Sequence, residues 1–149
     1  MTASEPSGLV SVRLGDALFG VPVLQVQDVV AEAPLNHVPL APCEVAGVLN
    51  LRGRIVTAID MRRRLGLPPQ DAARMSVIVE RQGELYALLV DDVGDVLWFD
   101  EAARETPPVT LSETWRAVCA GLFRLDDALL LVLDIEAALT LQPDPALAA

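Results

Sequence analysis

Arginine side chains are the groups in this sequence whose clustering most clearly suggests a binding role. Arg52, Arg54, Arg62, Arg63 and Arg64 lie close together in a chain whose formal net charge is −10. Arginine is favoured at protein interfaces because its planar head donates several hydrogen bonds to a carboxylate. The cluster therefore suggests contact with an acidic partner, and a solvated helix face remains the alternative for residues 62–64.

Groups that could support catalysis or bind a metal are sparse. The chain has one histidine, His37, and its two cysteines, Cys43 and Cys119, do not have the spacing of metal ligands. An acidic segment at 91–95 could suggest a cation site, but a matching Asp28 in the first half indicates a partly structural role. The sequence has no Gly-rich phosphate loop and no nucleophile elbow. We expect a protein that is not an enzyme and binds no metal or cofactor.

Charge and composition also limit the possible partners. A net charge of −10 and an aromatic content of 4% oppose binding to nucleic acid. No apolar run approaches the roughly 20 residues that a membrane span needs. Residues 1–8 are small and polar, unlike a signal peptide. We therefore expect a cytoplasmic protein that does not insert into the membrane.

The elements that would carry these residues are short and mainly β. Alternating apolar residues on both sides of a turn signal predict four hairpins. Their turns are at Gly15-Asp16, Arg52-Gly53, Gln82-Gly83 and Asp126-Asp127.

The remaining segments are expected to be short helices and loops. Asp60 and Asp134 can cap short helices that run to Leu65 and Leu139. The spacing of the valines in 23–30 predicts a short amphipathic helix or an irregular turn. Residues 36–38 are expected to form a short strand and residues 101–108 a loop.

The two halves of the chain resemble each other. An offset of 67 aligns Val10, Val12, Phe19, Val26, Asp28 and Val29 with Val77, Val79, Tyr86, Val93, Asp95 and Val96. An offset of 74 aligns Gly47, Leu51, Ile55, Ile59 and Asp60 with Gly121, Leu125, Leu129, Leu133 and Asp134. The change of offset predicts an insertion near 98–120 in the second copy. Shared aspartates and a shared order of elements favour duplication over chance alignment of apolar residues, and two such small units would pack on a common apolar seam as curled sheets or small barrels.

Positions that differ between the copies are candidates for function. Arg52-Gly53 corresponds to Asp126-Asp127, so a tight turn is needed in both copies but the arginine is not. The basic residues 62–64 correspond to 136–138, which are acidic or neutral. Arg52 is the strongest candidate for a partner contact, and hydrogen bonding to nearby carbonyls is its alternative role.

A longer motif extends this comparison. The segment Gly47-Val-Leu-Asn-Leu-Arg-Gly-Arg-Ile-Val-Thr-Ala-Ile-Asp-Met-Arg62 resembles the signature of the CheW family of chemotaxis coupling proteins. Segments 19–29 and 90–97 resemble the opening hairpin of that family and its counterpart in the second half. The resemblance covers about residues 8–141.

The resemblance implies a mainly β fold of two SH3-like five-stranded β-barrel subdomains related by internal duplication, with short helices. It implies a single domain at 9–141 whose two halves intertwine. Residues 1–8 are then expected to be a flexible N-terminus and residues 142–149 a C-terminal tail.

The resemblance also implies partners. Family members bridge the cytoplasmic tips of methyl-accepting chemoreceptors and the regulatory domain of the CheA-type histidine kinase, and they can enter rings or arrays. A related pathway, such as twitching, is the alternative. A receptor tip would dock in the apolar groove between the barrels. The residues it implies as partner contacts are Val26, Asp28, Val29, Asn50, Arg52, Gly53, Val93, Val96 and Leu97, whereas Gly47, Asp60 and Asp91 are expected to be structural. The difference between the copies adds Arg62 as a partner contact, although Arg54 and the arginines at 62–64 depart from the more mixed residues expected of the family.

Overall fold

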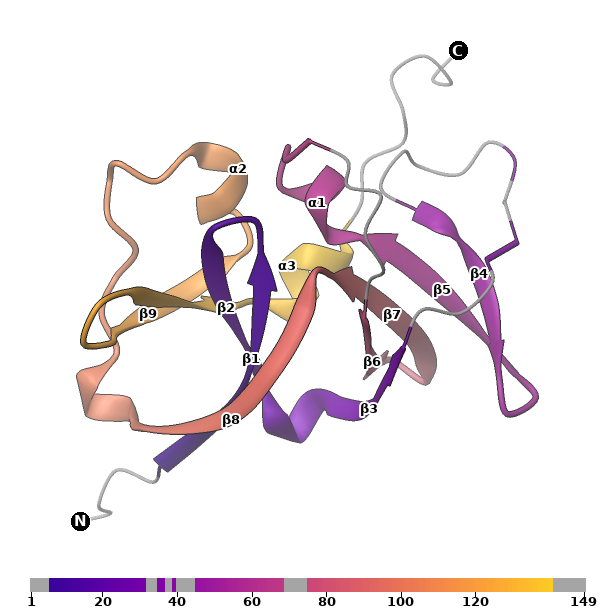
Figure 1. Ribbon diagram of the computed structural model, residues 1–149, viewed down its shortest axis with the longest axis horizontal. Helices are drawn as coiled ribbons and strands as arrows, with labels where there is room; N and C mark the ends of the chain where they lie inside the picture. The colour runs from indigo at the N-terminus through magenta and orange to yellow at the C-terminus, as the bar shows by residue number, and fades with distance from the viewer. Residues whose placement is uncertain (1–5, 32–34, 37–38, 40–44, 69–74, 141–149) are drawn as a thin grey trace.

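The computed structural model describes residues 6–31, 35–36, 39, 45–68 and 75–140, which form two five-stranded sheets and a few short helices (Figure 1). The strands are β1 (Pro6–Leu14), β2 (Ala17–Pro22), β3 (Val26–Ala31), β4 (Val45–Leu51), β5 (Arg54–Asp60), β6 (Met75–Arg81), β7 (Glu84–Val90), β8 (Asp92–Asp100), β9 (Cys119–Arg124) and β10 (Leu129–Leu133). The helices are α1 (Met61–Arg64), α2 (Glu113–Arg116) and α3 (Ile135–Leu139), with 3₁₀ turns at Val23–Gln25 and Glu101–Ala103.

All four predicted hairpins are present. The turns at Arg52-Gly53 and Gln82-Gly83 have positive φ at both positions, 51° and 85° in the first and 54° and 82° in the second. Two such residues are typical of the type I′ turn, whose twist matches that of the flanking strands. Asp60 and Asp134 cap α1 and α3, as predicted, by accepting backbone N–H groups of the first turn.

Each sheet combines strands from both halves of the chain. Sheet 1 has the order β8-β1-β2-β10-β9, and sheet 2 has the order β3-β6-β7-β5-β4. The hairpin β1–β2 therefore joins three strands of the second half, and the hairpin β6–β7 joins three strands of the first half. The two sheets lie side by side, with the first hairpin in the left lobe of Figure 1 and the second in the right lobe. The halves are intertwined rather than placed in sequence.

The pairing registers of the two sheets repeat each other. Val12 lies opposite Phe19 in sheet 1, and Val79 lies opposite Tyr86, the positions 67 residues later, in sheet 2. The parallel contacts also correspond, because β10 pairs with β2 in sheet 1 and β5 pairs with β7 in sheet 2. The same architecture is thus built twice, as the duplication predicts.

Two glycines mark equivalent bulges. Gly47 and Gly121 have φ of 150° and 158°, and each lies beside an irregularity in its strand pairing. A Cβ at Gly47 would meet the carbonyl oxygen of Asn36 at 2.6 Å, so the position requires glycine. Asn36 pairs with Val48, and Glu105 pairs with the equivalent Leu122. The extra residues of the second copy therefore lie mainly between Glu105 and β9, where α2 is found.

Three hydrophobic clusters fill the molecule. The largest lies between the sheets and is built around Phe19 and Val21 of β2 and Leu88 and Val90 of β7. Alternate residues of the same two strands point the other way, into a smaller cluster within each sheet. β2 and β7 are thus covered on both faces, which explains the nearly continuous apolar sequence of β7. The largest cluster is the expected apolar seam.

Some predictions from the sequence were wrong. In segment 23–30, the 3₁₀ turn at Val23–Gln25 fits the irregular-turn alternative, but the amphipathic helix is wrong. Strand β3 follows the turn, and a bulge between Val26 and Asp28 interrupts its alternation. The spacing of the valines thus matched the period of a helix, although most of these residues form a strand. Residues 6–8, assigned to a flexible N-terminus, begin β1, and residues 101–108 include a 3₁₀ turn and the bridge at Glu105. Strand β8 and helix α2 were not predicted.

Several expectations concern residues outside the described ranges. They are the roles of His37 and Cys43, residues 1–5 of the expected N-terminus, residues 37–38 of the expected short strand, and the C-terminal tail at 142–149. Strand pairing in the described residues runs in one row in each sheet, from β8 to β9 and from β3 to β4. Among the described residues, no strand pairing joins the two edge strands of either sheet, so hydrogen-bonded closure of a barrel is not observed there.

Candidate functional site

The tip of the β4–β5 hairpin is closed by a hydrogen bond between two of its own residues. The side-chain oxygen of Asn50 accepts a hydrogen bond of 2.9 Å from the backbone N–H of Gly53. This bond spans three residues and closes the turn, with the intervening Arg52 in a left-handed conformation. Asn50 and Gly53 thus have a structural role in presenting the side chain of Arg52.

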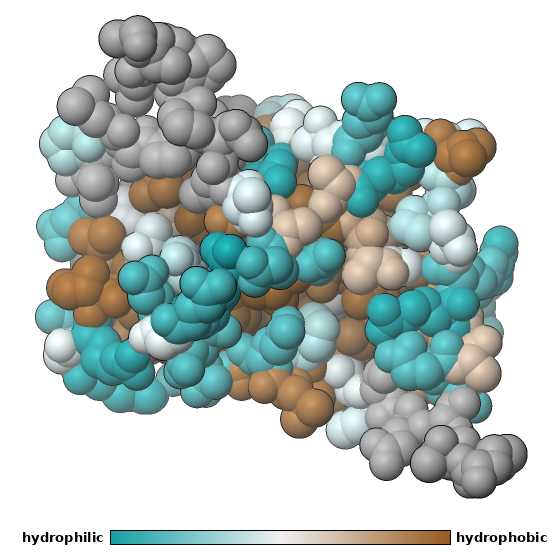
Figure 2. Space-filling model, turned by 180° about the vertical axis from the view of Figure 1, so that it is seen from behind, coloured by the Kyte–Doolittle hydropathy of each residue, from teal (hydrophilic) through white to brown (hydrophobic). Residues whose placement is uncertain are grey.

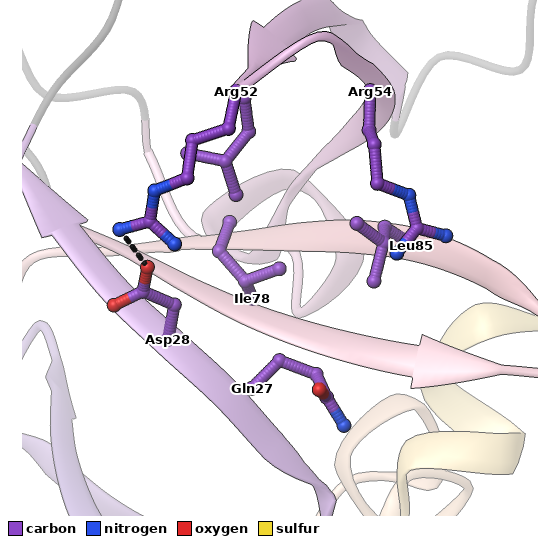
Figure 3. Close-up of a pocket in the computed structure, with 7 residues that line it drawn as sticks. Gln27, Asp28, Arg52, Arg54, Ile78 and Leu85 are labelled. Atoms are coloured by element: carbon purple, nitrogen blue, oxygen red, sulfur yellow. Dashed lines mark ion pairs between the residues drawn. The ribbon is translucent and has the colours of Figure 1, made fainter.

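Arg52 reaches across the mouth of sheet 2 to strand β3. Its Nη2 atom lies 2.8 Å from Oδ2 of Asp28, and the two side chains are 77% and 27% exposed (Figure 3). The other oxygen of Asp28 accepts the backbone N–H of Val29 at 2.8 Å. Because β3 and β4 are the two edges of sheet 2, this ion pair shows that the sheet curls until its edges approach each other.

A shallow pocket of about 160 Å³ lies beside this ion pair. Ile78 and Leu85 form its apolar floor, while Arg52 and Arg54 extend from the hairpin on either side of it (Figure 3). The site therefore presents an exposed guanidinium, held by a carboxylate, at the rim of a small apolar depression. An arginine beside an apolar depression is a composition that is common at protein interfaces.

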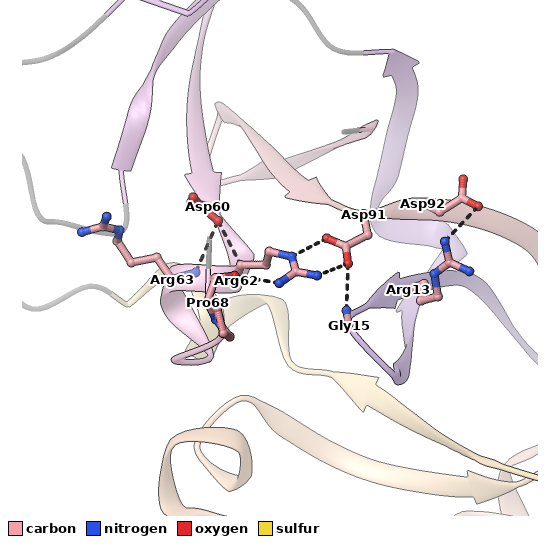
Figure 4. A network of polar contacts seen from close by, with 8 residues as sticks. All are labelled: Arg13, Gly15, Asp60, Arg62, Arg63, Pro68, Asp91 and Asp92. Atoms are coloured by element: carbon pink, nitrogen blue, oxygen red, sulfur yellow. Dashed lines mark hydrogen bonds and ion pairs between the residues drawn. The ribbon is translucent and has the colours of Figure 1, made fainter. Parts of the chain in front are cut away.

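Arg62, which the difference between the copies suggested as a partner contact, is bound within the molecule. Its guanidinium makes two hydrogen bonds to Asp91, with Nε at 2.7 Å from Oδ1 and Nη2 at 2.6 Å from Oδ2. Its Nη1 donates to the carbonyl of Pro68 at 2.7 Å (Figure 4). Only 13% of the Arg62 side chain and 7% of the Asp91 side chain are exposed. Arg62 is thus occupied within the molecule.

Asp91 connects the two sheets. Its Oδ2 also accepts the backbone N–H of Gly15, in the β1–β2 turn of sheet 1, at 2.8 Å. The hydrogen bonds from Arg62 hold the pKa of the Asp91 carboxyl below its usual value, and the Gly15 bond acts in the same direction against the effect of burial. The expectation that Asp91 is structural agrees with these contacts.

The other two arginines of α1 differ in whether they contact the rest of the protein. Arg64 donates to the carbonyls of Ala137 and Ala138 at the end of α3, so it joins the two equivalent helices. Arg63 is exposed, and its side chain points away from the network in Figure 4. The basic cluster of the sequence therefore divides into two groups. Arg52 and Arg54 are exposed on the β4–β5 hairpin, whereas two of the three arginines of α1 make hydrogen bonds within the protein.

The apolar residues implied as partner contacts do not share one face. Val26 and Val93 pack against the seam, whereas Leu97 packs inside sheet 1. Val29 is partly buried on β3, and Val96 is 42% exposed on β8. Val29 and Val96 occupy equivalent positions on the edge strands of the two sheets. Apolar residues reach the surface in Figure 2 as separate patches bordered by polar side chains.

Trp98 is an exposed residue that the sequence analysis missed. It follows Val96 on the same face of β8, is 63% exposed and lies over Gly8, where an added Cβ would approach its ring within 2.8 Å. The available signal was the run Val96-Leu97-Trp98-Phe99, because four apolar residues in a row are consistent with a strand that is apolar on both faces.

The aspartates of the acidic segment 91–95 have separate surroundings. Asp91, Asp92 and Asp95 do not converge: Asp92 approaches Arg13 at 3.9 Å, and the backbone carbonyl of Asp95 accepts from Ser11. Within the described ranges, no three His, Cys, Asp or Glu side chains are placed to hold a metal ion. No helix in the same residues is long and apolar enough to cross a bilayer.

Comparisons with known proteins agree on one kind of relative. Residues 8–142 match a family model described as the CheW-like domain. The probable chemotaxis protein CheW of Rhizobium etli is 33% identical over 132 residues, which are 87% of this chain and 84% of the relative. Protein PilI of Pseudomonas aeruginosa is 31% identical over 101 residues, 65% of this chain and 57% of the relative. The crystal structure of the scaffolding protein TtCheW from Thermoanaerobacter tengcongensis superposes with a TM-score of 0.78 and 31% identity, over 87% of this chain and 84% of the other.

Proposed function

The chain belongs to the CheW-like domain family, and from this membership we propose that it is a non-catalytic adaptor that couples chemoreceptors to a CheA-type histidine kinase in bacterial chemotaxis. It acts in the cytoplasm, beside receptor arrays at the membrane. It binds the cytoplasmic tips of the receptors and the regulatory domain of the kinase, and it takes part in their assembly into rings or arrays.

Family membership carries the adaptor proposal, and the exposed Arg52–Asp28 pair is the structural observation that supports Arg52 as its partner contact. The turn is closed by Asn50 and Gly53 without any contact from the arginine side chain. An ion pair with an arginine that is 77% exposed contributes only about 0–1 kcal/mol to folding. Folding thus leaves Arg52 largely unexplained, whereas a partner carboxylate has access to the guanidinium donors that Asp28 does not occupy.

The edge strands support a second contact area for the receptor tip. β3 and β8 are equivalent edge strands that border the seam, and Val26 and Val93 pack against the seam core from them. Val29 and Val96 lie farther along the same strands, with Val96 the more exposed of the two. An amphipathic receptor helix can place its apolar face against such residues.

The test is a binding assay with purified receptor-tip peptide assemblies and the kinase regulatory domain. We expect Arg52→Glu to weaken binding to at least one of these partners by tenfold or more, about 1.4 kcal/mol, because it places a negative charge beside Asp28. Arg63→Glu is the matched control, since Arg63 is exposed and its substitution changes the net charge equally. Unchanged binding and kinase coupling by a folded Arg52→Glu protein would remove Arg52 from the site.

A charge exchange separates the role of the pair from that of the arginine. Arg52→Asp combined with Asp28→Arg keeps an ion pair between the two edges of sheet 2 but reverses the exposed charge. If the partner recognises the arginine, the exchanged protein keeps its stability and loses binding. If the pair only holds the hairpin in place, the exchanged protein binds normally.

The alternative function is the same coupling role in a related pathway, such as the one that drives twitching. The match to PilI is the observation behind this alternative, because PilI is a relative that does not carry the chemotaxis name, although it covers less of this chain than CheW of Rhizobium etli does. Parallel binding assays with receptors and kinases from each pathway of the source organism distinguish the two, since the cognate set should bind more tightly.

A further inference from the structure

The face of sheet 1 that forms the seam continues past the seam cluster. Alternate residues of β1 point to this face: Val12 packs in the cluster, Val10 is buried, and Gly8 comes next. On β8, Val96 lies opposite Val10 and Trp98 lies opposite Gly8. Residues that lie opposite each other on paired strands point to the same face, so Val96 and Trp98 extend the apolar surface of the seam outward.

Two exposed apolar side chains meet at this outer end. A Cβ at Gly8 would come within 2.8 Å of the Trp98 ring and within 2.9 Å of Cγ1 of Val23, so both side chains lie against the glycine. Gly8 does not have the positive φ that would require glycine, so its role is to leave room for the ring. Trp98 is 63% exposed, and Leu24, which follows Val23, is 94% exposed. Val23, Leu24, Val96 and Trp98 are called the outer patch.

The equivalent positions of sheet 2 are filled differently. Three pairs differ at the offset of 67: Trp98 corresponds to Ala31, Gly8 to Met75 and Leu24 to Asp91. Met75 packs against the seam cluster, and Asp91 is held in the buried ion pair with Arg62. The architecture is thus complete in sheet 2 with a small residue in place of the tryptophan. The fold that the copies share does not account for the exposed Trp98 and Leu24.

We propose that the outer patch binds the receptor-tip helix where that helix extends beyond the seam, with Trp98 as the main anchor. This inference rests on the proposed adaptor function and adds a contact to it. Tryptophan is enriched among the few residues that supply most of the binding energy of an interface. Because the indole already lies against Gly8, it loses little side-chain freedom when a partner covers it.

Continuity and charge select the receptor helix as the occupant. Val96 belongs both to the edge strand that borders the seam and to the outer patch, so one helix lying along β8 contacts both. Asp100 is exposed two residues beyond Trp98, and the adjacent Glu101 is paired with Arg104 at 2.7 Å. This rim keeps a net negative charge, so the helix should carry a basic residue next to its apolar face. A second copy of this chain is disfavoured, because two such rims repel each other.

The test measures the affinities of the full chain for a receptor-tip assembly without tryptophan and for the kinase regulatory domain, in parallel. Trp98→Ala, which installs the residue found in sheet 2, should lower receptor affinity by about tenfold and leave kinase affinity unchanged. Leu24→Gln removes an exposed side chain without disturbing the core and should lower receptor affinity by about threefold. Val109→Gln is the matched control, because Val109 is 86% exposed in the loop before α2, and it should change neither affinity.

Tryptophan emission adds a direct measure of burial. Receptor binding should shift the emission of the unmodified chain to shorter wavelength, and the shift should be absent from Trp98→Phe, which retains Trp115.

Four outcomes would overturn the inference and leave the adaptor function standing. They are normal receptor affinity of both patch variants, equal loss of receptor and kinase affinity, an emission shift that persists without Trp98, and a self-association of the chain that Trp98→Ala abolishes while receptor affinity is kept. An unmodified chain that binds no receptor tip would instead remove the adaptor function itself, and this inference with it.

Discussion

The helices α1 and α3 occupy equivalent places, and the second residue of each connects to the hairpin turn of the opposite sheet. Arg62 of α1 binds Asp91, which in turn accepts the N–H of Gly15 in the β1–β2 turn. Glu136 of α3 accepts two hydrogen bonds from Arg81, beside the β6–β7 turn. The same link between sheets has thus been built twice, with the charges of the helix residues reversed.

The difference between the two links lies in their burial. The side chains of Arg62 and Asp91 are 13% and 7% exposed, whereas those of Arg81 and Glu136 are 25% and 63% exposed. The charge difference between Arg62 and Glu136 suggested that Arg62 binds a partner. In the structure, both residues instead make an ion pair that links the two sheets. A difference between the copies is therefore a reason to propose a function only where neither residue is needed inside the fold, which is the basis of the proposal for Arg52.

Arg62→Ala should have the largest effect on stability. It leaves the buried carboxylate of Asp91 without its counter-ion, which costs about 3–5 kcal/mol of unfolding free energy. Arg81→Ala breaks the exposed link and should cost about 0–1 kcal/mol. Urea unfolding of both variants measures the difference, and similar losses would show that burial does not distinguish the two links.

The equivalent glycines provide a second comparison. Gly47→Ala should destabilise the protein by about 1–3 kcal/mol, because the new Cβ meets a backbone oxygen at 2.6 Å in a left-handed conformation. Gly121→Ala should cost less, since the nearest atoms at 2.8 Å belong to the flexible side chain of Arg104. Thermal unfolding of the two variants makes the comparison, and a larger loss for Gly121→Ala would contradict it.

Acid should weaken the buried link more than the exposed one. The pKa of Asp91 is lowered in the folded state by its hydrogen bonds from Arg62. Its contribution is therefore fully present above the unfolded pKa of about 4 and is lost as pH falls through the lower folded value, at about 1.4 kcal/mol for each unit of difference. Asp91→Asn should be less stable than the unmodified protein at pH 7, and its stability should fall less below pH 4. Parallel stability curves would exclude this contribution.

Arg52→Asn should have the smallest effect on stability. Asparagine tolerates the left-handed conformation better than arginine and is favoured in type I′ turns, so the unfolding free energy should stay the same or rise by up to about 1 kcal/mol. Partner binding should nevertheless fall. A clear loss of stability would mean that the ion pair with Asp28 contributes more to the fold than its exposure indicates.

Local features of the sequence were sufficient to predict the hairpins, the capped helices and the duplication. Those features act over a few residues: glycines at turns, alternating apolar side chains, and aspartates before helices. Strand β3 was missed because the 3₁₀ turn and bulge around Val26 change the alternation, and β8 was missed because Gly94 and Asp95 interrupt its apolar pattern.

The candidate site was predictable in part. The motif identified Arg52 and its turn, but the pairing with Asp28 depends on the curl of sheet 2, which brings its two edges together. The burial of Arg62 could not be predicted from its neighbours, because its counter-ion lies at the junction of β7 and β8. Exposure decides between a structural and a binding arginine, and exposure is a property of the packed molecule.

The exchange of strands between halves has a consequence for how the molecule folds and arose. Neither half can complete a sheet from its own strands. During folding, β2 must therefore pair with β10, which lies about a hundred residues further along the chain. We expect slow, all-or-none folding, and two separately produced halves should be unstructured until mixed. A single unit with this topology could complete its sheets only by exchanging strands with a second copy, so joining two units in one chain makes that pairing intramolecular.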